Sequence, residues 1–269
     1  MDIWVVKENG EKEKFDVKKV KRALRRSGLS NKEAEEILKE LSPKLYDGMS
    51  TKKIYATVYG IVRDLRPEVT HKYNLKRALQ MLGPAGYEFE DFIAKLLSLK
   101  GYNIGLRQQI QGKCVNHEID VTASKDHENY LIECKFHNEP GTKCRIQTAL
   151  YVYARYLDIN AGRERKFTKP WLITNTKFSE DVVSYCECMD LPLLGWRYPL
   201  KEGLEALIDK TKCYPVSVID MNPHTLRKLL TRKIVTVMDI PTDAHKLADM
   251  VQISLPSAKK IIEKAEYAK

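Results

Sequence analysis

Long apolar runs are missing from the sequence. No stretch approaches the roughly 18 to 20 apolar residues that a helix needs to cross a bilayer. The first residues, Met1-Asp2-Ile3-Trp4, are acidic and then strand-like. The sequence therefore lacks the features of a membrane protein and of a secretory signal peptide. We expect a cytoplasmic protein with no membrane partner.

Cysteines are few, and no two of them form a C-x-x-C pair. They stand at positions 114, 134, 144, 186, 188 and 213. In a cytoplasmic chain we expect free and mostly buried thiols rather than disulfides. The spacing does not fit a zinc knuckle, so a structural zinc site is not predicted.

Acidic residues are too few to balance the basic ones. The chain has 46 Lys and Arg against 36 Asp and Glu, which gives a formal net charge of +10. An excess of Lys and Arg favours a polyanionic partner, because such residues release counterions from phosphate backbones. Charge alone does not identify that partner.

Two changes of pattern divide the 269 residues into three expected domains. Residues 1–84 predict a hairpin around Asn9-Gly10 and then helices, and they end in the linker signal Gly83-Pro84-Ala85-Gly86. Residues 85–200 alternate between helices and strands, which predicts a mixed α/β sheet covered on both faces. Residues 201–269 predict a small all-α domain.

In the middle domain, charged residues are expected to meet on one sheet face. Strands are predicted near residues 103–111, 117–124 and 130–136. Residues i and i+2 of a strand face the same side, so Glu133 and Lys135 share a face from which Cys134 points away. If the last two strands pair antiparallel, Asp120 approaches the same face.

Two carboxylates and one ammonium are what metal-dependent phosphodiester hydrolysis requires. Asp120 and Glu133 would bind Mg²⁺ or Mn²⁺, with the Cys134 carbonyl as an extra ligand, because these ions favour oxygen. The metal would polarise the phosphate and activate a water that Lys135 positions. The competing interpretation is a solvated cross-strand ion pair. The strand is apolar enough to be central, however, and charge there is costly unless it is used or paired.

At these residues the chain resembles the PD-(D/E)xK nuclease superfamily, and more closely its Mrr-type restriction endonuclease branch. The matching residues are Asp120, Glu133-Cys134-Lys135 and a helix that begins Gly86-Tyr87-Glu88-Phe89-Glu90. The resemblance implies a restriction-endonuclease-like core in which Glu90 is a further catalytic acid. His117-Glu118 replace the usual Gly-Gly, and Glu133 stands where the branch usually has Gln. These departures put the substrate preference in doubt.

A helix is expected from about Lys143 to Asp158. It contains Gln147-Thr148-Ala149-Leu150-Tyr151, which is similar to the Q-x-x-x-Y element of the RecB-like nucleases. That similarity implies a catalytic role for Gln147. The alternative is a helix that simply packs on the sheet through Ala149, Leu150 and Ala154.

Residues 3 to about 82 resemble an ATP cone, a regulatory module known from ribonucleotide reductases and from transcriptional repressors. The resemblance is carried by Val5-Val6-Lys7-Glu8-Asn9-Gly10, Phe15-Asp16, Lys19-Val20, Tyr46-Asp47-Gly48 and Thr51-Lys52-Lys53-Ile54-Tyr55. It implies binding of ATP or dATP without hydrolysis, with Lys7, Lys19 and Thr51 contacting the nucleotide. No G-x-x-x-x-G-K-[ST] loop is present. Because Glu8 replaces a residue that is basic in many cones, a degenerate module for folding or dimerisation is the alternative.

The carboxy-terminal helices resemble a helix-hairpin-helix fold, which presents backbone amides to DNA phosphate. The usual hairpin glycines are absent. Arg232-Lys233-Ile234-Val235 and Val251-Gln252-Ile253-Ser254 stand in their places. A protein-interaction domain is therefore the alternative.

Together these features predict a metal-dependent endodeoxyribonuclease, in restriction or DNA repair, with an adenine nucleotide as effector. The rival is a non-catalytic, nucleotide-responsive DNA-binding regulator. A nuclease that acts on RNA or on branched DNA is a third interpretation. A homo-oligomer is compatible with each of them.

Overall fold

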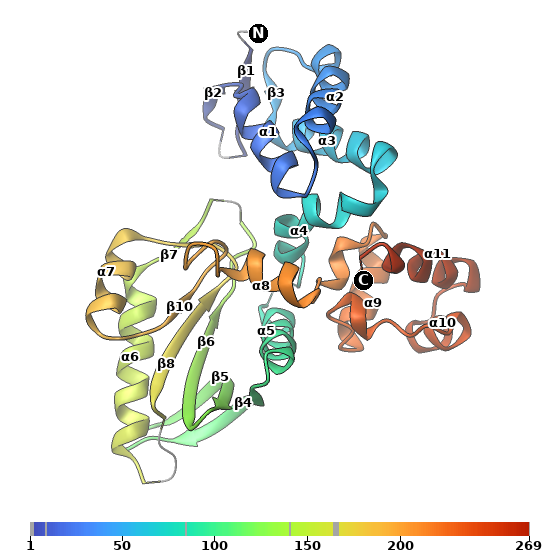
Figure 1. Cartoon of the computed structure of the whole chain (residues 1–269). Coiled ribbons are helices and arrows are strands. Elements are labelled where there is room, and N and C mark those ends of the chain that lie inside the picture. The colour runs from blue at the N-terminus through green and yellow to red at the C-terminus, as the bar shows by residue number, and fades with distance from the viewer. Residues whose placement is uncertain (1–2, 9, 84, 140, 164–166, 269) are drawn as a thin grey trace. The chain divides into compact units, whose positions relative to one another are not determined.

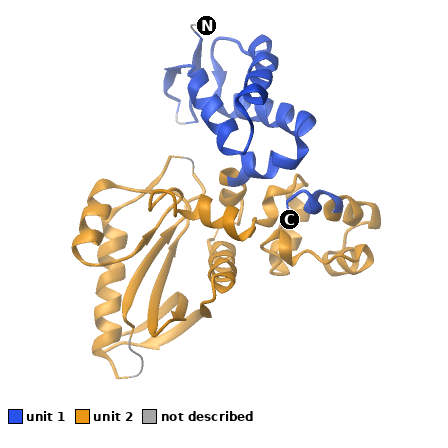
Figure 2. Cartoon of the chain, in the orientation of Figure 1, with its two compact units in different colours: residues 1–75, 263–269 blue, residues 76–262 orange. Residues whose placement is uncertain are grey.

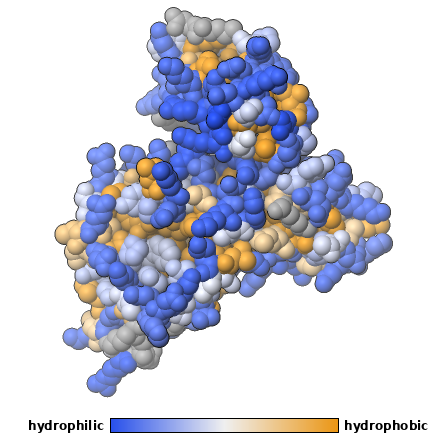
Figure 3. Space-filling model, viewed as in Figure 1, coloured by the Kyte–Doolittle hydropathy of each residue, from blue (hydrophilic) through white to orange (hydrophobic). Residues whose placement is uncertain are grey.

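The structure is a computed structural model that describes residues 3–8, 10–83, 85–139, 141–163 and 167–268 (Figure 1). The chain divides into two compact units (Figure 2), one of residues 1–75 with 263–269 and one of residues 76–262. In these described ranges no helix is both long and apolar enough to span a bilayer. Hydrophilic side chains cover most of the face drawn in Figure 3, with smaller apolar areas between them.

The first unit contains a small sheet of order β2-β1-β3 among its described residues. β1 (Trp4–Val6) pairs antiparallel with β2 (Lys12–Lys14) and parallel with β3 (Met49–Ser50). Gly10 has a φ of 84° in the connection between β1 and β2. Asn9 of the predicted hairpin turn lies outside the described residues, as does Pro84 of the predicted linker.

The helices that follow are capped by the residues that the sequence offers for this purpose. They are α1 (Val17–Arg26), α2 (Asn31–Leu41), α3 (Thr51–Leu65) and α4 (Thr70–Gln80), with 3₁₀ turns at Ser42–Lys44 and Pro67–Val69. The side chains of Asp16, Ser30 and Ser50 each accept a backbone amide of the helix that they precede, which satisfies one of its unpaired donors. Their apolar faces enclose a core that includes the fully buried Leu24 and Val58.

The second unit contains, within the described ranges, a five-stranded mixed sheet of order β10-β8-β6-β5-β4. Its strands are β4 (Asn103–Gln111), β5 (Asn116–Lys125), β6 (Glu128–Lys135), β8 (Lys169–Thr174) and β10 (Leu193–Leu194). β4, β5 and β6 pair antiparallel, whereas β6, β8 and β10 pair parallel. The predicted mixed sheet is therefore confirmed, and so is the antiparallel pairing that brings Asp120 towards Glu133.

Helices cover both faces of this sheet (Figure 1). α5 (Tyr87–Leu99) lies on one side, and α6 (Ile146–Ala161) and α7 (Glu180–Cys188) lie on the other. The helix expected from Lys143 is wrong at its start. Lys143–Cys144 instead form strand β7, which pairs parallel with β9 (Lys177–Phe178). So short a strand has no periodicity to reveal it, because its partner lies more than 30 residues away in the sequence.

Short helices follow the sheet. They are α8 (Leu204–Thr211), α9 (Pro223–Thr231), α10 (Ala244–Val251) and α11 (Leu255–Glu266). The 3₁₀ turns Val216–Val218 and Val237–Asp239 stand 21 residues apart, and so do the first residues of α9 and α10. Lys95 of α5 forms an ion pair with Asp239 at 2.8 Å, which connects the 3₁₀ turn Val237–Asp239 to the helix beside the five-stranded sheet.

The residues that replace the expected hairpin glycines keep a backbone conformation that glycine prefers. Lys233 has a φ of 58° and Gln252 has a φ of 50°. A left-handed conformation costs a non-glycine residue roughly 1–2 kcal/mol. Both turns thus contain a left-handed residue that is not a glycine.

Two substitutions on α5 test where the core lies. Phe92 is fully buried and Leu99 is 44% exposed on the same helix. We expect Phe92→Ala to lower the free energy of unfolding by about 3–5 kcal/mol, because it removes buried apolar area and leaves a cavity. Leu99→Ala should change it by less than about 0.5 kcal/mol. Denaturant unfolding of both variants measures the difference, and equal losses would contradict the placement of α5.

Candidate active site

β5 and β6 stop pairing at the point where the candidate site begins. Their ladder ends at Val121 opposite Ile132, so Asp120 and Glu133 are the next residue on each strand. In place of a further ladder bond, the Cys134 amide donates to Asp120 Oδ2 at 2.8 Å. The Asp120 carboxylate thus fills the opening between the strands and satisfies a backbone donor there.

Glu133 is paired with a buried arginine of α6. Arg155 is 5% exposed, and its Nη1 donates to Glu133 Oε2 at 2.5 Å. It also donates to the Glu118 carbonyl, and its guanidinium lies over the ring of Tyr151 with 5.1 Å to the centroid. Lys135 forms no ion pair with any residue that the structure describes. The solvated pair between Glu133 and Lys135 therefore does not form.

Glu90 is held by an arginine in an unusual backbone conformation. The β4–β5 ladder skips Arg107, which stands opposite Asp120 and has a φ of 47°. This arginine donates to Glu90 Oε2 at 2.9 Å and to Asp91 Oδ1 at 2.5 Å, both on α5. Burial raises the pKa of Glu90, and the bond from Arg107 opposes that rise. A strained residue thus anchors the predicted additional acid.

Asp120 is the acidic residue of the site with the largest shift in pKa. Burial, with the negative charge of Glu133 as the second cause, raises the pKa of Asp120 to about 7. The Cys134 amide and the Arg155 charge act in the opposite direction. A perturbed carboxyl pKa beside a second carboxylate is a common feature of functional sites.

The donor set fits a divalent cation of the oxygen-preferring type. Asp120 and Glu133 supply carboxylate oxygens. The Cys134 amide points towards Asp120, and the carbonyl of a strand residue points to the same side as its amide. Over the described parts of the chain, no three His, Cys, Asp or Glu side chains gather as a metal site. A third protein ligand would therefore be the predicted Cys134 carbonyl.

Gln147 lies on the same helix face as the buried arginine. Gln147, Tyr151 and Arg155 are spaced by four residues on α6, which aligns them along one stripe. Gln147 itself is exposed. The alternative packing face was wrong for Leu150 and Ala154, which are also exposed. α6 packs instead through Ala149, Val152, Arg155 and Ile159.

The amino-terminal unit has a second candidate site. A pocket of about 200 Å³ is lined by Val5, Glu13, Phe15, Asp16, Lys19, Val20, Ala23, Thr51, Ile54, Tyr55, Val58 and Tyr73. The rings of Tyr55 and Tyr73 are stacked with centroids 5.3 Å apart. The predicted contacts Lys19 and Thr51 therefore share one mostly apolar pocket, and the two tyrosines are lining residues that the sequence did not single out.

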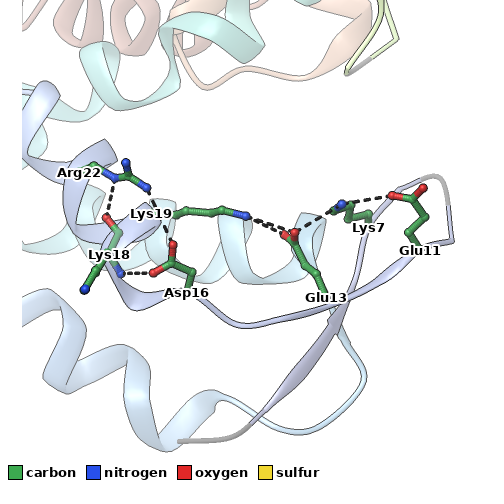
Figure 4. Close-up of polar contacts among 7 residues, drawn as sticks. All are labelled: Lys7, Glu11, Glu13, Asp16, Lys18, Lys19 and Arg22. Atoms are coloured by element: carbon green, nitrogen blue, oxygen red, sulfur yellow. Dashed lines mark hydrogen bonds and ion pairs between the residues drawn. The ribbon is translucent and has the colours of Figure 1, made fainter.

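Lys7 and Lys19 converge on one carboxylate at the edge of this pocket (Figure 4). Lys7 Nζ lies 3.4 Å and Lys19 Nζ lies 3.2 Å from Glu13 Oε2. The hydrogen bond from Lys19 is the main cause of the lowered pKa of Glu13. Lys7 also contacts Glu11 at 3.1 Å. Two ammonium groups are thus brought together with Glu13 as their common counter-charge.

Comparison with known proteins gives both parts a family. Residues 3–80 match the ATP cone domain, and residues 84–191 match the restriction endonuclease domain of Mrr type. The chain belongs to the Mrr-type restriction endonuclease family and carries an amino-terminal ATP cone domain. The resemblance drawn from the sequence is confirmed.

Two further comparisons found proteins that are similar to this chain over about two thirds of its length. An uncharacterized protein of Archaeoglobus fulgidus is 37% identical over 174 residues, which are 65% of this chain and 98% of the relative. The crystal structure of a protein of unknown function, AF1548, matches with a TM-score of 0.59 and 37% identity. The matched region covers 67% of this chain and 96% of the chain in that crystal structure.

His117, which replaces a glycine of the usual family pattern, contacts helix α6. His117 Nε2 lies 2.8 Å from Asp158 Oδ2 on α6. Asp158 also accepts the amides of Cys114 and Val115 at 2.9 and 3.3 Å, and the contact with His117 is the main cause of its pKa of about 2. The start of β5, and with it Asp120, is thereby fixed to α6.

The raised pKa of Asp120 predicts how stability depends on pH without metal. Its folded pKa of about 7 exceeds the ordinary value of 3.8, so the folded state binds the proton more tightly. The free energy of unfolding should fall as pH rises from about 4 to 7. The side chain at this position cannot ionise in the Asp120→Asn variant. The difference in free energy of unfolding between this variant and wild type should therefore be roughly 1–4 kcal/mol more favourable to the variant at pH 8 than at pH 4. Denaturant unfolding in EDTA at both values measures this gain, and a pH-independent difference would contradict it.

Proposed function

We propose that this Mrr-type protein is an endodeoxyribonuclease that depends on Mg²⁺ or Mn²⁺ and takes ATP or dATP as effector. The proposal is supported by the bond to Asp120 from the amide of Cys134, which stands between Glu133 and Lys135 of β6, at the point where β5 and β6 separate inside a restriction endonuclease domain. The net charge of +10 supports DNA as the substrate.

Each residue of the site has a distinct task in this proposal. A bound divalent cation supplies polarisation of the scissile phosphate and lowers the pKa of a water. Asp120 and Glu133 would hold it, and Arg155 fixes Glu133 by Oε2, which leaves Oε1 for the site. Lys135, exposed at the end of β6, would hold the attacking water and offset charge on the phosphate. Glu90, positioned by Arg107, adds a further acid.

The ATP cone pocket suits an adenine nucleotide. Its apolar walls and stacked tyrosines suit a flat base. Lys19 and Thr51 line the pocket, and Lys7 reaches its edge through Glu13. Phosphates would take over the contacts that both lysines now make with Glu13. The pocket therefore supports nucleotide binding despite the acidic Glu8.

Three further expectations remain proposals. They are the division into domains of residues 1–84, 85–200 and 201–269, the helix-hairpin-helix-like role of the last part, and a catalytic role for Gln147. The cytoplasmic setting and the role in restriction or DNA repair rest on the family alone.

Single substitutions test the nuclease site. Plasmid cleavage with Mg²⁺ or Mn²⁺ should fall by about 100-fold or more in Glu133→Gln and in Lys135→Ala. The first removes a ligand charge, and the second removes the group that positions water. Glu202→Gln and Lys210→Ala make the same changes at exposed positions outside the site and should cleave like wild type.

Two results would overturn this assignment. Equal cleavage by all five proteins would mean that the reaction occurs elsewhere. Nucleotide-dependent DNA retention without cleavage under any divalent ion would favour the rival, a non-catalytic DNA-binding regulator.

Ligand-induced stabilisation tests the cone. ATP or dATP at about 100 times its dissociation constant should stabilise the wild type by about 2.7 kcal/mol, seen as a rise in Tm. Lys19→Ala should reduce this rise because it removes a phosphate partner. Lys18 is the neighbouring residue and does not line the pocket, so Lys18→Ala should show the same rise in Tm as wild type. If neither nucleotide raises the Tm of the wild type, the cone serves only in folding or dimerisation.

A further inference from the structure

An exposed basic surface lies beside the candidate active site, on the short sheet formed by β7 and β9. Lys143 stands directly opposite Lys177 in the parallel ladder, and opposite residues of a pair point to the same face. Two like charges are therefore held side by side. Like charges directly opposite each other destabilise a sheet, which favours a role for them outside folding.

The burial pattern shows that this basic face points to solvent. Lys143 and Arg145 are exposed, and Cys144 between them is buried. Lys177 is exposed, and Phe178 next to it is buried. Alternation of this kind places the three basic side chains on the outer face of β7 and β9.

Carboxylates do not neutralise these residues. No described residue forms an ion pair with Lys143, Arg145 or Lys177. The nearest acids along the chain, Glu180 and Asp181, open α7 just after β9 but form no ion pair with Lys177 in the described structure. Burial is the main cause of the lowered pKa of Lys76, and the charges of Lys177 and Arg197 lower it further.

β9 begins three residues after the residue of β8 that pairs with the proposed catalytic lysine, Lys135. Lys135 ends β6, and its carbonyl accepts the Thr174 hydroxyl at 2.7 Å, three residues before Lys177. The charge of Lys135 also acts on Cys144, the neighbour of Lys143. A polyanion that enters the site at Lys135 would thus meet the outer face of β7 and β9 next.

We propose that Lys143, Arg145 and Lys177 bind the phosphate backbone of duplex DNA and hold it across the site. The inference rests on the proposed function and names the surface by which the substrate is gripped. Phosphate contacts fix register and orientation without reading sequence. Lysines that repel one another in the free protein gain their counter-charge when the backbone binds.

DNA binding without cleavage tests this surface. Binding of a short fluorescent duplex is measured by anisotropy in EDTA and in Ca²⁺ over a range of salt concentrations. Lys143→Gln/Lys177→Gln should bind about tenfold more weakly, and its slope of log affinity against log salt should be shallower by about 2. Lys32→Gln/Lys39→Gln removes the same charge from exposed positions of the ATP cone domain and should keep the wild-type slope.

The stability of the variant separates a binding role from a structural one. Because the substitutions relieve cross-strand repulsion, Lys143→Gln/Lys177→Gln should melt at or above the wild-type Tm. A lower Tm together with weaker binding would indicate a structural role and overturn the proposal. Unchanged affinity and slope would overturn it too, as would wild type that binds no duplex. Tighter binding of a matched RNA duplex with the same lysine dependence would reassign the surface to RNA.

The outcome is independent of the nuclease assay. Lysine-dependent DNA binding in a protein that never cleaves would sustain this surface and refute the proposed activity. Cleavage with an unchanged salt slope in the double variant would do the reverse.

Discussion

A carboxylate removed from water needs a compensating partner, and the second unit has to meet this need at three positions close together. Glu133 obtains a buried guanidinium from α6, and Glu90 obtains Arg107 from β4. Asp120 accepts the Cys134 amide, and burial raises its pKa to about 7. A divalent cation bound at Asp120 would offset the negative charge of the two carboxylates that meet where the strands separate.

This requirement explains features of the scaffold that packing alone does not. Arg107 keeps a φ of 47° within a strand, a conformation that apolar packing gives no reason to retain. Arg155 takes a buried place on α6 that an apolar residue would fill at lower cost. His117 and Asp158 then fix the start of β5 to the same helix. Stability is spent here on holding acids in place, which is the usual relation between an active site and its fold.

Most of this architecture was predictable from local patterns, and the exceptions share one cause. β4 begins and ends where alternation placed it, and the pairing of β5 with β6 followed from two apolar runs joined by a polar turn. Arg155 was not predictable, because an arginine on the buried face of a helix contradicts the pattern by which such faces are recognised. Its partner Glu133 lies 22 residues away. Strand β7 was missed likewise, since two residues carry no period.

Both candidate sites contain an internal ion pair at the position where the proposed ligand would bind. In the cone, Glu13 stands between Lys7 and Lys19 and supplies the negative charge that phosphates would bring. In the nuclease domain, Arg155 supplies Glu133 with the positive charge that a metal would bring. A ligand therefore binds only if it interacts with the charged side chain more strongly than the internal partner does. Weakly charged competitors consequently bind poorly. Lys143 and Lys177 form no ion pair with any residue that the structure describes, so DNA would neutralise them without first displacing a described carboxylate.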